Sequence, residues 1–263
     1  MKLATILPTK FLSYTKEDDY HMALAHLVGK DAEYTEFYKK VSTTGAYVIL
    51  DNGVIEGDQQ NIATICERAK SIGASEIILP DVFKNMGETL DASFEALQFV
   101  RRFYPELKIM VVPQGLTVTE WVECAEEMLT WGIDAIGVPK VLVHLDGRDA
   151  RLHAIASITK TLKVLRAKGK EVAVHLLGCW TTPLELTIIE MAAKSGTIYP
   201  VRGCDSALPY VYTIEGLKID EGDRPNMAMD FEHLDIDEEL LAENIELWKK
   251  SVIVKKDKVI NIF

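Results

Sequence analysis

Short hydrophobic runs alternate along the chain with longer segments in which apolar residues recur every three or four positions. The short runs predict buried strands at residues 3–7, 46–50, 76–79, 108–112, 134–138, 172–177 and 197–201. The longer segments predict helices at residues 61–72, 89–103, 119–131, 149–168 and 237–252, a further helix beginning near 181–183, and a mixed helical region at about 18–40. Gly73, Gly132 and Gly169 follow three of these helices, where glycine is a favourable C-cap.

The spacing of the runs predicts how the strands are connected. One strand and one helix together take about 30 residues, which is typical of parallel strands joined by crossover helices. Since no linker or low-complexity tract interrupts the alternation, we expect one α/β domain over residues 1–263, a (β/α)8 TIM-like barrel. Residues 210–214 are the candidate for the eighth strand. An open doubly wound sheet is the alternative, although no GxGxxG motif follows the first strand.

Composition narrows the class of protein. The chain has 263 residues, of which 48% are hydrophobic, so it can bury a sizeable core. Four scattered cysteines without a CxxC pattern predict neither a disulfide framework nor a zinc finger. No run approaches the roughly 18 apolar residues of a membrane span, and the apolar start of the chain is too short for a signal peptide. We therefore expect a soluble, cytoplasmic protein that needs no membrane.

The net charge of the chain limits how it can bind nucleic acid. A formal net charge of -11 argues against an indiscriminate nucleic-acid coat but leaves room for a local basic groove. The candidate residues for contact with nucleic acid are the basic residues Lys140, Arg148, Arg151, Lys160, Lys163, Arg166, Lys168, Lys170 and Arg202. Several belong to the helix at 149–168, where a solvated helix face is the other interpretation. We expect binding to nucleic acid to be weak and strongly salt-dependent.

Polar residues follow the predicted strands one after another. They are Asp51, Asp81, Gln114, Lys140, His175 and Asp205. In a barrel, the carboxyl ends of the strands meet at one rim, so these side chains are expected to converge on one pocket. Each aspartate alone also fits a turn or a helix N-cap. Turn chemistry does not require an acid or amide after nearly every strand, and the recurrence therefore favours a functional site.

Other residues near this rim have less specific interpretations. His175 lies in an apolar run and is either a satisfied core histidine or a catalytic group. Lys140 either binds phosphate or is solvated at the rim, and Cys179 and Cys204 are expected to be buried, small hydrophobic residues. A metal centre of Asp51, His175 and Asp205 is conceivable, but neither HxH nor HExxH is present to support it.

Four segments in order give a family resemblance. Residues 50–53 (LDNG) resemble D-S-G-G, residues 112–115 (VPQG) resemble V-Q-G, and residues 175–178 (HLLG) with Thr182 and Pro183 resemble H/Y-L-x-G…T-P. Residues 203–207 (GCDSA) resemble a shortened G-x-D-x-F-D-S-A. These are motifs of the tRNA-guanine transglycosylases and their relatives, which insert 7-deazaguanines into nucleic acid. The chain is similar to that family over about residues 46–215, most of the expected barrel.

The resemblance implies a role for each matched residue. Asp205 is implied to be the nucleophile that attacks C1′ and displaces guanine, and Asp51 the general acid and base for the departing and incoming bases. Asp81 and Gln114 are implied to hold the edge of the heterocycle. Together with the rim position, this gives as substrate-binding candidates Asp81, Gln114, Gly115, Gly137, Lys140, His175, Leu177 and Gly178. A carboxylate attacking a sugar forms a covalent intermediate, as in retaining glycosidases.

Departures from the family pattern shift the expected substrate. No cysteine follows Cys204, so the C-terminal zinc subdomain of the tRNA enzymes is not expected, and neither a metal nor a cofactor is predicted. Val54 and Leu116 stand where the family has a second glycine. The chain therefore looks more like the phage branch that exchanges guanine in DNA, and it would then work in the host cytoplasm. DNA is expected rather than tRNA, with free 7-cyano-7-deazaguanine as a typical incoming base and a homodimer or helper protein as further partners.

Two other functions remain open from the sequence. The same carboxylates suit an N-glycoside hydrolase that releases a purine base without replacing it. A base-binding or partner subunit without catalysis is the other alternative, since family members pair with inactive homologues. The intact set of Asp51, Asp81, Gln114 and Asp205 favours an enzyme.

Overall fold

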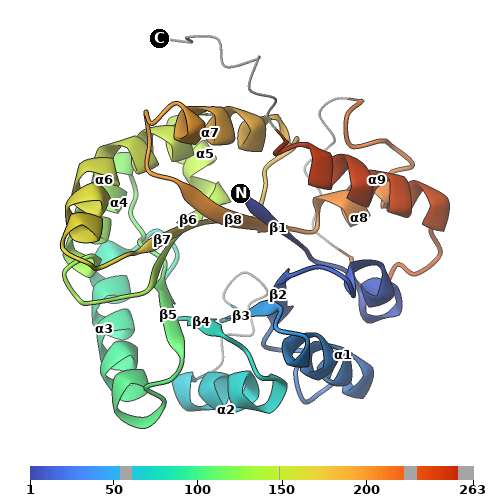
Figure 1. The fold of residues 1–263 in the computed structure, drawn as a ribbon, viewed down its shortest axis with the longest axis horizontal. Helices are drawn as coiled ribbons and strands as arrows, with labels where there is room; N and C mark the ends of the chain where they lie inside the picture. Colours follow the sequence, from blue (N-terminus) through green and yellow to red (C-terminus); the bar gives the residue numbers. More distant parts are fainter. Residues whose placement is uncertain (54–60, 148, 222–229, 254–263) are drawn as a thin grey trace.

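Eight parallel strands form a nearly closed barrel in the computed structural model, which describes residues 1–53, 61–147, 149–221 and 230–253 (Figure 1). The strands lie in the order β1-β8-β7-β6-β5-β4-β3-β2. They are β1 (Lys2–Thr5), β2 (Tyr20–Leu24), β3 (Tyr47–Asp51), β4 (Glu76–Ile78), β5 (Lys108–Val111), β6 (Ala135–Pro139), β7 (Ala173–Leu177) and β8 (Val201–Ser206). Since β1 and β2, the two ends of this order, lie side by side, the fold is the expected (β/α)8 TIM-like barrel.

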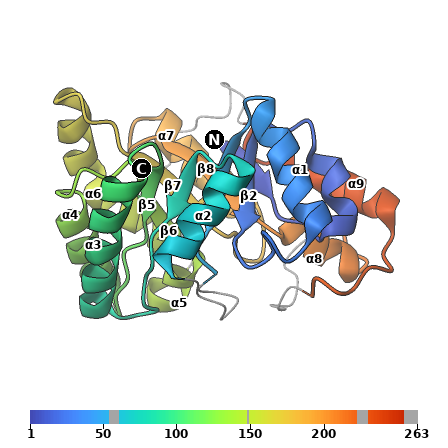
Figure 2. The same ribbon diagram turned by 90° about the horizontal axis from the view of Figure 1, so that it is seen from below.

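Helices surround the strands on the outside (Figure 2). The α-helices are α1 (Ala32–Thr43), α2 (Ile62–Ile72), α3 (Met86–Phe103), α4 (Val118–Met128), α5 (Val143–Asp146), α6 (Ala150–Ala167), α7 (Leu184–Lys194), α8 (Leu208–Ile214) and α9 (Glu238–Lys250), with 3-10 helices η1 (Thr9–Thr15) and η2 (Lys140–Leu142). Their ends follow from local chemistry. For example, Asn61 accepts a hydrogen bond from the backbone N–H of Thr64, and Gly73 ends α2 with a φ of 67°.

Three sequence predictions are wrong at the place where the barrel closes. Strand β2 lies inside the region 18–40, for which the sequence predicts helix. Every residue of this strand is buried, but Tyr20 and His21 interrupt the hydrophobic run by which a strand is recognised. Strand β8 begins at Val201, where the predicted strand at 197–201 ends. Residues 210–214 belong to α8, whose buried face packs against α9. Val54 and Arg148 lie outside the described residues.

The barrel interior is layered. A small apolar cluster inside it includes Met22, Ile49, Ile78 and Met110, one residue from each of four adjacent strands. The larger core lies between the strands and the helices and includes Trp121 of α4 and Trp248 of α9. Polar residues occupy the interior on both sides of the inner cluster, towards the amino and the carboxyl ends of the strands. The inner cluster thus lies between the polar residues at the carboxyl end, where barrels of this kind carry their sites, and those at the amino end.

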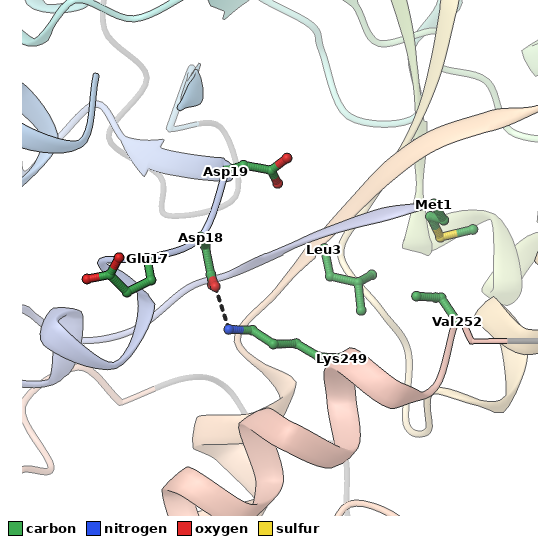
Figure 3. A pocket seen from close by; sticks show the side chains of 7 residues that line it. All are labelled: Met1, Leu3, Glu17, Asp18, Asp19, Lys249 and Val252. Atoms are coloured by element: carbon green, nitrogen blue, oxygen red, sulfur yellow. Dashed lines mark hydrogen bonds and ion pairs between the residues drawn. The ribbon is translucent and has the colours of Figure 1, made fainter. Parts of the chain in front are cut away.

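One ion pair bridges the seam between β1 and β2 at its amino end, and a second ties α9 to the segment before β2. Lys2 binds Asp19 at 2.6 Å, and Lys249 near the end of α9 binds Asp18. A cavity of about 280 Å³ lies here, lined by Met1, Leu3, Glu17, Asp18, Asp19, Lys249 and Val252 (Figure 3). It lies at the end of the barrel opposite to the rim on which the sequence places the site. Among the described residues, every helix is too short or too polar to cross a membrane.

Candidate active site at the carboxyl end of the barrel

Asp205 lies on β8, inside the barrel, and only 7% of its surface is exposed. Its Oδ1 is 2.9 Å from Nε2 of His175 on β7, and its Oδ2 accepts the backbone N–H of Gly178 at 3.3 Å. His175 and Gly203 are register partners on adjacent strands, which brings the imidazole beside the carboxylate. The structure thus brings together two residues that the sequence places at the same rim, and it shows that His175 is a buried residue with polar partners.

A buried polar chain continues from His175 towards the amino end of the barrel. The hydroxyl of Tyr20 on β2 is 2.8 Å from Nδ1 of His175, and Nε of Arg202 donates to the Tyr20 oxygen at 3.1 Å. Arg202 also donates to both carboxylate oxygens of Glu76, at 2.6 and 2.8 Å, and Tyr47 donates to Glu76 at 2.6 Å. Sequence reasoning missed Tyr20, Tyr47 and Glu76, because their partners lie on strands far away in the chain.

Gly203 is required by this arrangement. A Cβ atom at this position would lie 2.6 Å from Cε1 of Tyr20, closer than real Cβ contacts. The glycine therefore lets the Tyr20 ring come close to the backbone of β8, where its hydroxyl reaches His175 on the next strand. The Gly203-Cys204-Asp205 segment thus supplies both the carboxylate and the space for its supporting residues.

Gly178 presents its N–H to Asp205 from a left-handed backbone, with a φ of 70°. A Cβ atom here would lie 2.8 Å from Cδ of Lys140, so the aliphatic part of that lysine packs over the glycine. On the other side, the fully buried guanidinium of Arg151 donates to the Gly178 carbonyl at 2.8 Å. Arg151 also binds Glu185 through Nε at 2.7 Å. Arg151 therefore fixes the loop after β7.

A second polar cluster lies after β4 and β5. Asp81 accepts hydrogen bonds from Nδ2 of Asn52 at 2.9 Å and from Nε2 of Gln114 at 2.6 Å. The backbone N–H of Lys84 donates to Oε1 of Gln114 at 3.2 Å, which turns the NH2 group of Gln114 towards Asp81. Burial raises the pKa of the Asp81 carboxyl, and the donors Asn52 and Gln114 offset part of that shift. The sequence predicted Asp81 and Gln114 as neighbours but not Asn52.

Lys84 itself is held in an uncommon conformation. Its φ is 58°, in the left-handed region that favours glycine. A non-glycine residue in that region carries a strain of order 1 kcal/mol or more, and such strain often marks a functional loop. Here it lets the backbone N–H of Lys84 reach Gln114, so the strained residue serves the cluster around Asp81.

Asp51 is the last residue of β3 and is half-buried. Its Oδ2 accepts the backbone N–H of Gly53 at 3.2 Å, the turn contact that the sequence suggested. The same strand end leads into Asn52, which is bound to Asp81. Asp51 and Asp81 therefore lie at the carboxyl ends of neighbouring strands, on the rim to which β8 brings Asp205.

The other predicted substrate-binding residues differ in their surroundings. Gly137 faces the barrel interior, where a Cβ would lie 2.8 Å from Leu177 and 3.2 Å from Met110. Leu177, the last residue of β7, packs against the inner apolar cluster. Gly115 lies against the first turn of α4, where a Cβ would lie 2.7 Å from Cβ of Glu120. Close packing on α4 is thus sufficient to require glycine at position 115.

Two of the basic residues proposed for nucleic-acid contact face the interior, which corrects that prediction. Arg151 is fully buried against Glu185, and Arg202 is bound to Glu76 inside the barrel. Cys179 and Cys204 are buried as expected, and burial raises the pKa of Cys179 to about 12. Within the described ranges, no three His, Cys, Asp or Glu side chains gather closely enough to hold a metal ion.

Comparison of the chain with known protein families and with curated proteins gives no match.

Proposed function

We propose that this chain is a base-exchange transglycosylase that replaces guanine in nucleic acid, DNA rather than tRNA, with a 7-deazaguanine. The observation that carries the proposal is the environment of Asp205. Its carboxylate lies at the carboxyl end of a barrel strand, and its two oxygens accept hydrogen bonds from an imidazole and a backbone amide. An oriented carboxylate of this kind is suited to nucleophilic attack on a sugar.

In the proposed reaction, an Asp205 oxygen attacks C1′ of a deoxyguanosine while the bond from C1′ to N9 breaks. Asp51 donates a proton to the departing guanine. The incoming 7-deazaguanine then loses its N9 proton to Asp51 as its nitrogen attacks C1′, and Asp205 leaves as a carboxylate. Two displacements at the same carbon retain its configuration. The target nucleotide has to leave its stack, which favours unpaired or flipped substrates.

Asp81 suits the recognition of a guanine-like edge. Hydrogen bonds from the side-chain amides of Asn52 and Gln114 hold its carboxylate in place. A buried acid can accept the N–H groups of a purine edge, and its raised pKa fits a site from which water is largely excluded. Leu177 and Gly137, which lie against each other inside the barrel, would offer an apolar surface to the flat ring.

The test is a trapping experiment with single-stranded DNA or tRNA that contains guanine, together with 7-cyano-7-deazaguanine. After denaturation, mass spectrometry measures the covalent adduct and the exchanged base. Asp205→Asn should lose the adduct and slow exchange by about 10³-fold or more, since the nucleophile is gone. The control is Asp91→Asn, which removes an exposed carboxylate on α3.

The outcomes separate the alternatives. Guanine release without incorporation would identify a hydrolase instead. Binding of the base, with equally little turnover by the wild type and by Asp205→Asn, would favour a non-catalytic subunit. An adduct that persists in Asp205→Asn would overturn the assignment of the nucleophile.

A further inference from the structure

The buried chain from Arg202 through Tyr20 to His175 fixes where each proton lies. Arginine donates but does not accept hydrogen bonds, so the contact of 3.1 Å from Nε of Arg202 makes the Tyr20 oxygen an acceptor. The hydroxyl hydrogen of Tyr20 must then point elsewhere. Among the described residues, its acceptor is Nδ1 of His175, 2.8 Å away.

The protonation of Tyr20 agrees with this direction. Its ring is buried and stacks on Tyr47, with the ring centroids 5.8 Å apart. Burial raises the pKa of Tyr20 far above its usual range, so the phenol keeps its proton and remains a donor at neutral pH. The Tyr20 oxygen accepts from a cation and its hydrogen is donated to the imidazole, which satisfies both hydrogen-bonding functions of the hydroxyl.

If Nδ1 of His175 accepts a hydrogen bond, the proton of the neutral ring is on Nε2. That nitrogen lies 2.9 Å from Oδ1 of Asp205, and Oδ1 is then the acceptor. We propose that Arg202 and Tyr20 hold His175 as its neutral Nε2–H tautomer, and that His175 is thereby a positioning residue that orients the carboxylate of Asp205. The role given to the carboxylate rests on the proposed transglycosylase function, whereas the tautomer follows from the hydrogen bonds alone.

The tautomer matters for the chemistry of Asp205. A neutral imidazole orients the carboxylate without cancelling its charge, whereas an imidazolium would pair with it and weaken it as a nucleophile. With Gly178 donating to Oδ2 at 3.3 Å, both oxygens are held and the plane of the carboxylate is set. An attacking oxygen that is already oriented loses little entropy in reaching C1′.

The direct test is ¹⁵N NMR of protein labelled at histidine. The chain has six histidines, and loss of one set of signals in His175→Gln assigns the resonances of His175. We expect Nδ1 to resonate as an unprotonated nitrogen and Nε2 as a protonated one at neutral pH. In Tyr20→Phe, which keeps the ring but removes the hydroxyl, the Nδ1 resonance should shift. A protonated Nδ1 in the wild type would overturn the proposal whatever the activity.

Kinetics of base exchange test the positioning role. Tyr20→Phe should lower kcat by roughly fivefold to tenfold, the usual effect of one hydrogen bond, and leave KM for the nucleic acid unchanged. The matched control is Tyr47→Phe, which removes a hydroxyl bound to Glu76 in the same network but leaves the contact between Tyr20 and His175 in place. An equal fall of kcat in both variants would mean a structural effect and would overturn the positioning role.

Rescue by a conservative variant gives a second kinetic readout. His175→Gln keeps an N–H donor near the position of Nε2, so it should retain more of kcat than His175→Leu, which has no donor. Equal activities of the two variants would contradict the role of the donor. If the wild type shows the expected ¹⁵N signals but catalyses no exchange, the proposed function fails while the tautomer assignment is supported.

Discussion

Two buried carboxylates lie at opposite ends of the barrel interior and have opposite kinds of partner. Glu76, the first residue of β4, is fully buried and accepts hydrogen bonds from both terminal nitrogens of Arg202 and from Tyr47. Asp205, near the end of β8, receives its hydrogen bonds from His175 and from the backbone of Gly178. One carboxylate is paired with a cation, and the donors that the described residues bring to the other are an imidazole and an amide.

The two kinds of partner indicate a structural role for Glu76 and are compatible with the chemical role that we propose for Asp205. A guanidinium that binds both oxygens of a carboxylate neutralises its charge and prevents it from acting as a nucleophile. Glu76 and Arg202 therefore anchor the amino end of the hydrogen-bond chain that leads to Asp205. Neutral donors orient a carboxylate and leave its charge available. A buried ion pair at the amino end of the barrel thus supports, through Tyr20 and His175, the carboxylate at the carboxyl end that we propose as the nucleophile. Tyr20 is the residue that links the two.

The largest stability effect is expected for Glu76→Gln. The substitution keeps the size of the side chain but leaves Arg202 without its anion, and breaking a buried ion pair costs about 3–5 kcal/mol. Because 22% of the Arg202 side chain is exposed, we expect a loss near the lower end of that range. Urea unfolding measures it, with exchange assayed at low temperature, where activity should fall far less than in Asp205→Asn.

The control for this prediction is Glu246→Gln, which removes the exposed pair with Lys250 on α9. Its free energy of unfolding should equal that of the wild type within error. If Glu76→Gln unfolded like the wild type but lost exchange as completely as Asp205→Asn, the division between a supporting and a reactive carboxylate would be wrong.

A smaller effect is expected for Gly178→Ala. An alanine at a φ of 70° carries a strain of about 1–2 kcal/mol, and its Cβ would lie 2.8 Å from Lys140. Relief of that clash should move the N–H away from Oδ2 of Asp205 and lower kcat. Gly169→Ala is the matched control, because its φ is 79° and an added Cβ meets nothing within 4 Å. Equal stability losses together with an unchanged kcat would show that Gly178 serves only the turn.

The sequence predicts the barrel because six of its strands have hydrophobic patterns that are easily recognised. Strands β3 to β7 lie within a residue or two of their predicted ranges, and the first run overlaps β1. The strands that sequence reasoning missed or misplaced are β2 and β8, which carry Tyr20, Arg202 and Asp205. Polar side chains that point into a barrel interrupt the apolar pattern that reveals a strand. The polar residues that β2 and β8 contribute to the supporting network therefore make these two strands hard to recognise in the sequence.

Part of the site could be predicted because a polar residue after a strand is visible locally. Asp51, Asp81, Gln114 and Asp205 were found in this way, and the structure places Gln114 on Asp81. The pairing of Tyr20 with His175 joins residues 155 positions apart, and that of Arg202 with Glu76 joins residues 126 apart. No local pattern encodes such contacts, since they depend on which strands face each other across the nearly closed barrel.

Asp81 extends the comparison to a third buried carboxyl. The pH dependence that it gives to the free energy of unfolding is the smallest effect that we expect. The side-chain amides of Asn52 and Gln114 that donate to Asp81 are neutral, and burial raises the pKa of this carboxyl in the folded protein. The folded protein therefore holds the Asp81 proton at pH values where the unfolded chain, with an ordinary pKa of about 3.9, has lost it. Stability contributed by this group is present at low pH and is lost as the pH rises through the raised folded pKa.

Unfolding in urea between about pH 3.5 and 7 tests this sign, with Asp81→Asn as the variant that lacks the titrating group. The wild type should gain free energy of unfolding relative to Asp81→Asn as the pH falls, and each unit of pKa difference corresponds to about 1.4 kcal/mol. Asp91→Asn controls for the loss of one exposed carboxylate. If the wild type instead lost stability relative to Asp81→Asn on acidification, the amides of Asn52 and Gln114 would outweigh burial. The folded protein would then favour the charged form of Asp81, as Arg202 favours the charged form of Glu76. Neutral donors and a paired cation would in that case have the same effect on a buried carboxylate.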